Sequence, residues 1–310
     1  MDTGKTLTKM QWGALAALVW LAPLSYITSV NGALAAGKWL PLLVALLLAS
    51  LFGCGLLWIC RTTALTRILR ESTTVWTDLA RMLLAVYLLV VAGYFLRGAA
   101  TLWTVWAVAE TPIWLYQLML LSFIGYGLHR GSSAILRLAV LAMAAVPILA
   151  LLDTLLLLPK FRWDRMLLPT SLDDLFVAGT GNYLAILAAA MPVFLWYGAP
   201  QDSSSRKAVG LGWVGSGIYL LLLPVRDTLT QGILTTWEYF PLLRTLKMVE
   251  MGVGLNRVEY LAILVLMSAM FTGVLVLAAA SREMLKRSRP WQQRGSIILS
   301  ILVLAAATFL

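Results

Sequence analysis

Residues 39–60 read WLPLLVALLLASLFGCGLLWIC and contain no charged side chain. An α-helix rises about 1.5 Å per residue, so about 20 apolar residues cross a hydrocarbon core of about 30 Å. This stretch therefore predicts a membrane-spanning helix. Stretches of similar character recur at about residues 12–29, 80–97, 111–128, 136–158, 175–199, 207–224, 257–280 and 294–310. We predict an all-α polytopic membrane protein with about nine transmembrane helices.

The composition excludes a soluble domain. Hydrophobic residues make up 61% of the 310 positions and charged residues 12%, whereas globular domains carry about 25% charged residues. The net charge of +10 does not indicate nucleic-acid binding, because the basic residues sit in short links rather than along one helix face. The chain has one histidine and no H-E-x-x-H, G-x-S-x-G or phosphate-binding glycine-lysine loop. Cys54 and Cys60 share one predicted helix. We expect no enzyme activity, cofactor, metal site or disulfide.

The basic residues also predict the orientation. If the N-terminus is cytoplasmic, the inner links hold 15 of the 24 Lys and Arg residues. We therefore place the N-terminus in the cytoplasm and expect a retained first helix rather than a cleaved signal peptide. Arg81 and Arg97 lie at predicted helix ends and are expected to extend to the headgroups. The outer link 225–256 is too charged to span and is expected to contain a surface helix.

The order of several short motifs resembles the spore-germination permease family, the B subunit of germinant receptors. The motifs extend over most of the chain and are Arg97, Glu110-Thr111-Pro112-Ile113-Trp114, His129-Arg130-Gly131, Arg137, Leu167-Leu168-Pro169, Tyr239-Phe240-Pro241 with Arg244, and Asn256-Arg257-Val258-Glu259. That family belongs to the amino acid/polyamine/organocation transporter superfamily. The resemblance implies a LeuT-like inverted-repeat helix bundle in a single domain, 1–310. The first repeat would occupy about 11–158 and the second, incomplete repeat about 171–310, without the tenth helix.

The implied fold places a ligand between helices one and six. In inverted-repeat transporters the first helix of each repeat is broken, and the half-helix ends offer unpaired backbone groups to the substrate. The candidate ligand-binding residues are Pro23, Ser25, Tyr26, Thr180, Asn182, Met191 and Pro192. The family's second break would align near Met191 and Pro192, but the carboxylate that usually accompanies it is absent. Alternatively, Pro23 and Pro192 are simple proline kinks, and the glycines at 179 and 181 form the turn that leads into the helix.

Three polar residues within the predicted helices are candidates for gating or ion binding. Asp153 lies about two turns from the outer end of the fifth helix, where it either pairs with a basic group or reaches headgroup water. Ser268 and Thr272 are one turn apart in the eighth helix, where sodium-coupled relatives place hydroxyl ligands. Hydroxyls bonded back to their own helix are the alternative.

The resemblance implies a permease-like subunit of a spore germinant receptor in the spore inner membrane. Such a subunit would bind a small germinant such as an amino acid and would associate with a larger membrane subunit and a lipoprotein. Two other functions stay open. One is an independent secondary amino acid transporter, which the lack of clear coupling-ion carboxylates disfavours. The other is a structural subunit without a ligand site of its own.

Overall fold

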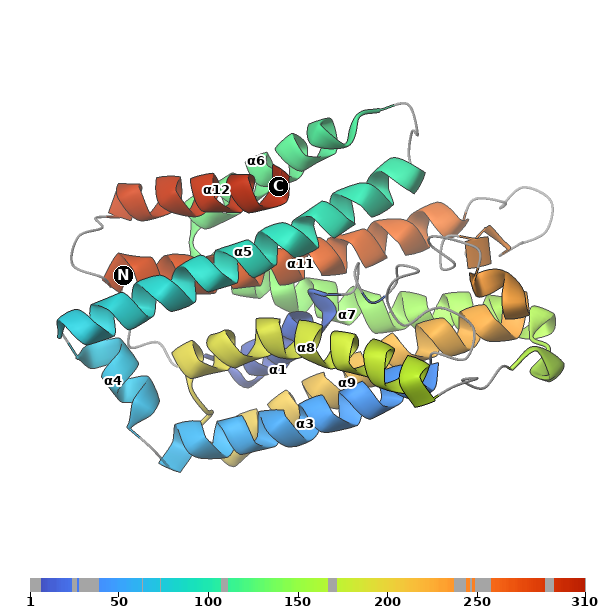
Figure 1. Ribbon diagram of the computed structural model, residues 1–310, viewed down its shortest axis with the longest axis horizontal. Helices are drawn as coiled ribbons and strands as arrows, with labels where there is room; N and C mark the ends of the chain where they lie inside the picture. The colour runs from blue at the N-terminus through green and yellow to red at the C-terminus, as the bar shows by residue number, and fades with distance from the viewer. Residues whose placement is uncertain are drawn as a thin grey trace.

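A computed structural model of the chain describes residues 7–23, 27, 39–62, 64–72, 74–106, 111–166, 172–236, 244–245, 247–248, 258–287 and 293–309. Within these residues every regular element is a helix, and successive long helices run in alternating directions (Figure 1). The elements are α1 (Lys9–Leu21), α3 (Trp39–Thr62), α4 (Leu65–Glu71), α5 (Val75–Trp106), α6 (Ile113–Arg130), α7 (Ser132–Leu157), η1 (Leu158–Lys160), η2 (Trp163–Arg165), α8 (Leu172–Tyr197), α9 (Ser203–Gln231), η3 (Gly232–Thr236), α11 (Val258–Arg287) and α12 (Gln293–Phe309).

Each predicted segment overlaps one of these helices. Among the described residues, six helices are long and apolar enough to cross a membrane: they lie in α3, α5, α7, α8, α9 and α11. Large apolar side chains such as Leu51, Leu141 and Leu211 are exposed on these helices, as a lipid-facing surface requires. The structure is that of a polytopic α-helical membrane protein.

Several predicted spans are shorter than the helices that they overlap. Hydropathy predicted a span at 80–97, but the helix α5 runs over 32 residues, Val75–Trp106. The seventh predicted span was expected to end at 224, but α9 continues through Pro224 to Gln231. The start of the expected outer link is therefore part of a transmembrane helix.

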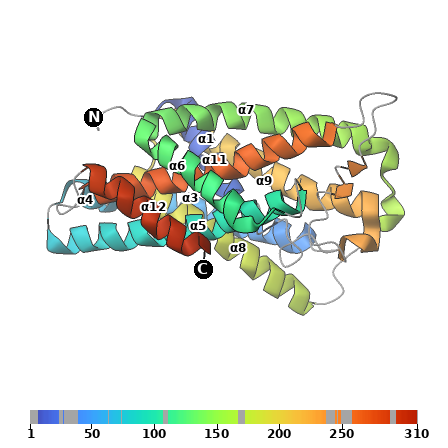
Figure 2. The ribbon, with the colours of Figure 1, turned by 90° about the horizontal axis from the view of Figure 1, so that it is seen from above.

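The helix α1 is the centre of the bundle. Residues Leu15 to Ala22 are at most 2% exposed, and α1 packs against α9, α11, α7 and α8 (Figure 2). Its start is fixed by a capping box, in which the Thr8 hydroxyl accepts from the Gln11 N–H and the Gln11 side chain accepts from the Thr8 N–H. A helix that is apolar on all sides is suited to such a position, shielded from both lipid and water.

Glycines allow the neighbouring helices to approach the backbone of α1. A Cβ atom on Gly273 of α11 would lie 2.9 Å from the Leu18 carbonyl oxygen and 3.0 Å from the Ala22 Cα. On α9, a Cβ on Gly212 would overlap the Gly13 carbonyl oxygen. Small residues at these positions permit close helix contact, as membrane-embedded packing favours.

Aromatic rings fill the space beside this contact. The Trp20 and Trp213 rings stack with centroids 5.7 Å apart, and Phe194 meets Trp213 edge-on at 5.5 Å. The Trp213 ring also contacts Gly53, where a Cβ would lie 2.8 Å from the indole. One indole therefore joins α1, α3, α8 and α9.

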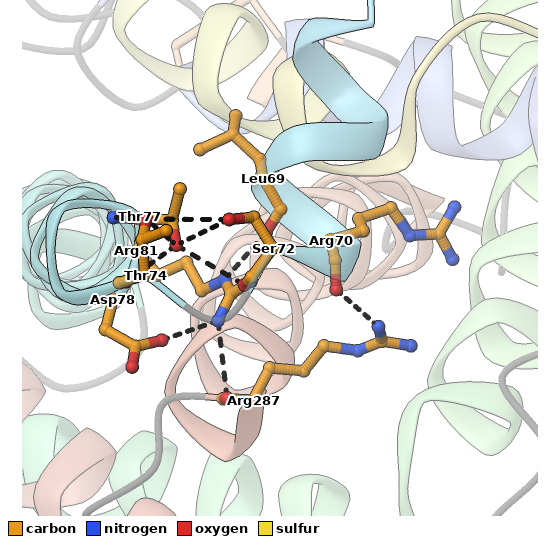
Figure 3. A network of polar contacts seen from close by, with 8 residues as sticks. All are labelled: Leu69, Arg70, Ser72, Thr74, Thr77, Asp78, Arg81 and Arg287. Atoms are coloured by element: carbon orange, nitrogen blue, oxygen red, sulfur yellow. Dashed lines mark hydrogen bonds and ion pairs between the residues drawn. The ribbon is translucent and has the colours of Figure 1, made fainter.

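At one end of the bundle, the short helix α4 is held by a buried arginine. Arg81 is 3% exposed and lies on α5; its guanidinium donates to the backbone carbonyls of Leu69 and Ser72, to that of Arg287, and to the Asp78 carboxylate (Figure 3). Arg287 in turn donates to the Arg70 carbonyl at 2.6 Å. The expectation that Arg81 reaches the headgroups is wrong. Carbonyls at the ends of α4 and α11 lack helical donors and accept hydrogen bonds from its guanidinium instead.

The glycine contacts generate the first prediction. Gly212→Ala should lower the apparent melting temperature of the purified protein, because overpacking against the Gly13 carbonyl costs about 1–3 kcal/mol. Gly210→Ala is the matched control on the same helix, since nothing lies within 4 Å of its Cβ, and it should leave the melting temperature unchanged or slightly raised. Equal melting temperatures for the two variants would contradict close packing of α9 on α1.

Candidate functional site

The helix α1 ends inside the protein, next to Pro23. The Ala22 N–H donates to the Leu18 carbonyl at 2.8 Å, and Ala22 and Pro23 then form a turn whose Pro23 carbonyl accepts from the Ile27 N–H at 3.0 Å. Because proline has no N–H, the Val19 carbonyl lacks its helical donor. Pro23 is buried, so this end of the helix does not face lipid. Ser25 and Tyr26 lie outside the described residues.

The helix α8 is not interrupted. It runs from Leu172 to Tyr197 with Pro192 inside it, so the expected break near Met191 and Pro192 is wrong and the alternative of a proline within a helix holds. The glycines at 179 and 181 are likewise inside α8, not in a turn before it. Neighbouring residues maintain a helix around an internal proline when the freed carbonyl is enclosed by protein.

Among the candidate ligand-binding residues on α8, Asn182 is a buried polar residue without a hydrogen-bond partner. It is 1% exposed, and neither Nδ2 nor Oδ1 of its amide has a hydrogen-bond partner. It belongs to the buried stripe of α8 that includes Gly179 and Ile186, and Gly179 rests on Pro41 of α3. Thr180 and Met191 are exposed and are not brought together with Asn182, whereas Pro192 is buried.

A second group of polar residues lies farther along the bundle, at the end opposite α4 (Figure 1). Nη1 of Arg226 is 3.2 Å from Oδ2 of Asp153, and Nη2 of Arg226 is 3.4 Å from Oδ1 of Asp227. Arg226 and Asp227 are at most 1% exposed and Asp153 is 8% exposed. The expected pairing of Asp153 with a basic group is confirmed, and its partner comes from the segment that was expected to be a link. We call Asp153, Arg226 and Asp227 the charged cluster.

Hydroxyl groups surround the C-terminal turn of α9 beyond the charged cluster. Thr228 donates to the Pro224 carbonyl at 2.7 Å and Thr230 to the Arg226 carbonyl at 3.0 Å. The helix ends where Gly232 adopts φ +61°, a conformation that favours glycine. Next to this end is a cavity of about 480 Å³, lined by Asp164, Arg165, Thr230, Gln231, Gly232, Ile233, Leu234 and Met248.

The two hydroxyl candidates on α11 donate to their own helix. Ser268 donates to the Leu264 carbonyl at 2.7 Å and is exposed; Thr272 donates to the Ser268 carbonyl at 2.6 Å and is buried. The alternative of back-bonded hydroxyls therefore describes both residues. Thr272 precedes Gly273, which touches the end of α1, whereas Ser268 faces away from the other candidates.

The described residues include no group of three or more His, Cys, Asp or Glu side chains placed to hold a metal ion. What the arrangement offers instead is an amide without partners on α8, an interrupted helix α1, and a cluster of two carboxylates with one guanidinium. Such groups bind polar small molecules, ions or protons through hydrogen bonds and charge.

Comparison with known families agrees with the sequence motifs. A sequence model of the spore permease family, described as "Spore germination protein", matches residues 15–310. No curated protein matches the chain.

Loss of the guanidinium should be far more damaging inside the bundle than on its surface. Arg226→Ala should strongly lower the melting temperature, because removing one partner from a buried ion pair costs about 3–5 kcal/mol. Arg67→Ala is the matched control: it breaks an exposed pair with Glu71 and should cause no measurable change. A small effect of Arg226→Ala, equal to that of the control, would show that the charged cluster is not closed in the folded protein.

Proposed function

Since the chain belongs to the spore germination permease family, we propose that it is the permease-like subunit of a spore germinant receptor and senses a small germinant such as an amino acid. The receptor would include a larger membrane subunit and a lipoprotein, in the inner membrane of the spore. Membership of the family supports a role in germination, and the geometry around α1 and α8 supports the binding of a small polar ligand.

The observation that most directly supports ligand binding is the buried Asn182 amide, which has no hydrogen-bond partner. A buried amide without partners costs free energy, and native proteins satisfy nearly all such groups. An amide has two N–H donors and a carbonyl acceptor, so it matches both the carboxylate and the ammonium group of an amino acid. A bound polar molecule would satisfy the Asn182 side chain.

The end of α1 supplies the other half of the proposed site. The Val19 carbonyl lacks a helical donor because of Pro23, and a carbonyl of this kind attracts an ammonium group. The helices α1 and α8 pack against each other, as the first helices of the two proposed repeats should. In this scheme the first LeuT-like repeat comprises α1, α3, α5, α6 and α7, and the second α8, α9, α11 and α12.

Charge at the α4 end supports the proposed orientation. This end gathers basic residues from the helix termini that meet there, among them Arg61, Arg130, Arg206, Lys286 and Arg287, all on elements whose directions alternate as Figure 1 shows. By the positive-inside rule this end, and the N-terminus with it, would face the cytoplasm.

Sensing requires that the ligand favour one state of the receptor. A ligand that binds two conformations equally well shifts neither, so the germinant must make contacts available in only one of them. The interrupted α1, which packs against α7, α8, α9 and α11, can pass such a difference to most of the bundle.

The charged cluster favours a second function, secondary amino acid transport. Intramembrane carboxylates mark ion and proton pathways in transporters, and the buried Asp153 and Asp227 are of this kind. Accumulation of amino acids by the protein alone in sealed vesicles would establish transport. A structural subunit would neither transport nor bind a germinant.

The ligand proposal is tested by thermal stabilisation of the purified protein across a panel of amino acids, nucleosides and sugars. A ligand at 100 times its dissociation constant stabilises the folded state by about 2.7 kcal/mol, so a selective rise in melting temperature is expected. Asn182→Leu should abolish that rise, whereas Thr180→Val, on the exposed side of the same helix, should retain it. A rise that survives Asn182→Leu would place the ligand elsewhere.

A further inference from the structure

The charged cluster has an excess of negative charge. It contains two carboxylates, from Asp153 on α7 and Asp227 on α9, but one guanidinium, from Arg226. With both carboxyl groups ionised the cluster has a net charge of −1, buried in the last turns of α7 and α9, two helices that are long and apolar enough to cross the membrane. A buried charge without a counter-charge is costly, so one more positive charge is needed to balance the cluster.

The hydrogen bonds show where that charge can be accommodated. Each carboxylate uses one oxygen to accept from Arg226. The other oxygens, Oδ1 of Asp153 and Oδ2 of Asp227, are buried without a hydrogen-bond partner, and the Thr245 hydroxyl is the neutral polar group beside Asp227. A proton on either of these oxygens turns an unsatisfied acceptor into a neutral hydroxyl and brings the net charge of the cluster to zero. Two interacting carboxyl groups of this kind titrate as a pair.

No other described charge pairs with the cluster. From the elements packed against it, η1 presents Lys160 and η2 presents Asp164 and Arg165; Lys160 donates to the Met248 carbonyl and Arg165 to the Thr230 carbonyl. Tyr219 lies two turns earlier on α9 and is half-buried. The described parts of α1 and α3 that pack beside α9 contribute no charged side chain near this end.

The cluster lies one helical turn from a cavity. Thr230 and Gln231, one turn beyond Asp227 on α9, line the cavity of about 480 Å³ at the end of the bundle opposite α4. Most of the cavity lining is apolar, and Asp164 and Arg165 provide the charged groups to which water in the cavity could bind. Water in this cavity can deliver a proton to the adjacent turn of α9.

We propose that Asp153, Arg226 and Asp227 form a proton-binding site that takes up one proton through this cavity. One carboxylate accepts a proton from hydronium, which leaves a neutral carboxyl group and a water molecule. When the proton is present, α7 and α9 are joined by a neutral cluster; when it is absent, an unbalanced negative charge lies between them. The proton thus links the contact of α7 with α9 to the pH on the cavity side, independently of whether a germinant binds.

The test measures the melting temperature of the full chain in lipid nanodiscs between about pH 8 and pH 5. The protonated cluster is the neutral one, so the wild-type chain should gain stability from this site as the pH falls. Asp227→Asn and Asp153→Asn each leave one carboxylate for one guanidinium, a neutral cluster at every pH. Both variants should therefore lack the gain in melting temperature at acid pH. The melting temperature of the wild-type chain should fall furthest below that of the variants at the highest pH.

The matched control is Asp202→Asn at the start of α9, outside the membrane-spanning part. The pKa of Asp202 is lowered by the hydrogen bond from the Ser205 backbone N–H, 2.7 Å away. Its stabilising contribution is thus present at neutral pH and is lost as the pH falls through that lowered pKa. Asp202→Asn should remove this acid-side loss while keeping the gain from the cluster, which is an effect of the opposite sign.

Two results would overturn the proposal. One is pH profiles of Asp227→Asn and Asp153→Asn that run parallel to the wild-type profile. The other is stabilisation by Na⁺ or K⁺, relative to choline, that is lost in Asp227→Asn, because the cluster would then hold a metal cation. If both variants fail to fold, infrared difference spectra of the wild-type chain decide: a carbonyl band of a protonated carboxyl group should grow as the pH falls, and its absence over the whole range would refute the site.

Discussion

The burial of α1 is the constraint on which the rest of the bundle depends. A helix whose residues Leu15 to Ala22 are almost wholly enclosed can be placed only if its neighbours approach its backbone closely, and Gly212 and Gly273 permit this from two sides. Once α1 is enclosed, it can end at Leu21 within the protein, because the neighbouring helices shield the buried end of the helix from hydrocarbon. The proposed ligand site follows from that interruption.

The two ends of the bundle treat buried charge differently. At the α4 end, Arg81 donates to three backbone carbonyls and one carboxylate, so its guanidinium is well supplied with acceptors and holds α4, α5 and α11 together. At the opposite end, Arg226 is shared by two carboxylates that each keep an oxygen without a partner. A satisfied network stabilises one structure, whereas an unsatisfied one changes with its surroundings. We therefore assign a structural role to the first and a proton-binding role to the second.

Much of the fold and family could be predicted from the chain, because hydropathy and the order of motifs are local properties. The family prediction is confirmed, and each predicted span overlaps a helix. The span boundary at 224 was wrong for a physical reason: adjacent Arg226 and Asp227 count as two penalties in a hydropathy scan, although their charges offset each other when both are buried. Asp153 could be predicted as a candidate because it interrupts an apolar helix.

The remaining features depend on contacts between distant segments. From the sequence, Pro192 could indicate either a break or a kink. In the structure α8 is an unbroken helix that packs against α3 and α1. The sequence alone determined the membrane environment, the approximate spans and the family, since each follows from composition, periodicity and the order of residues along the chain. Only the tertiary structure decided which polar side chains are buried together and which, like Asn182, stay without a partner, because pairing between residues more than 70 positions apart depends on how helices pack.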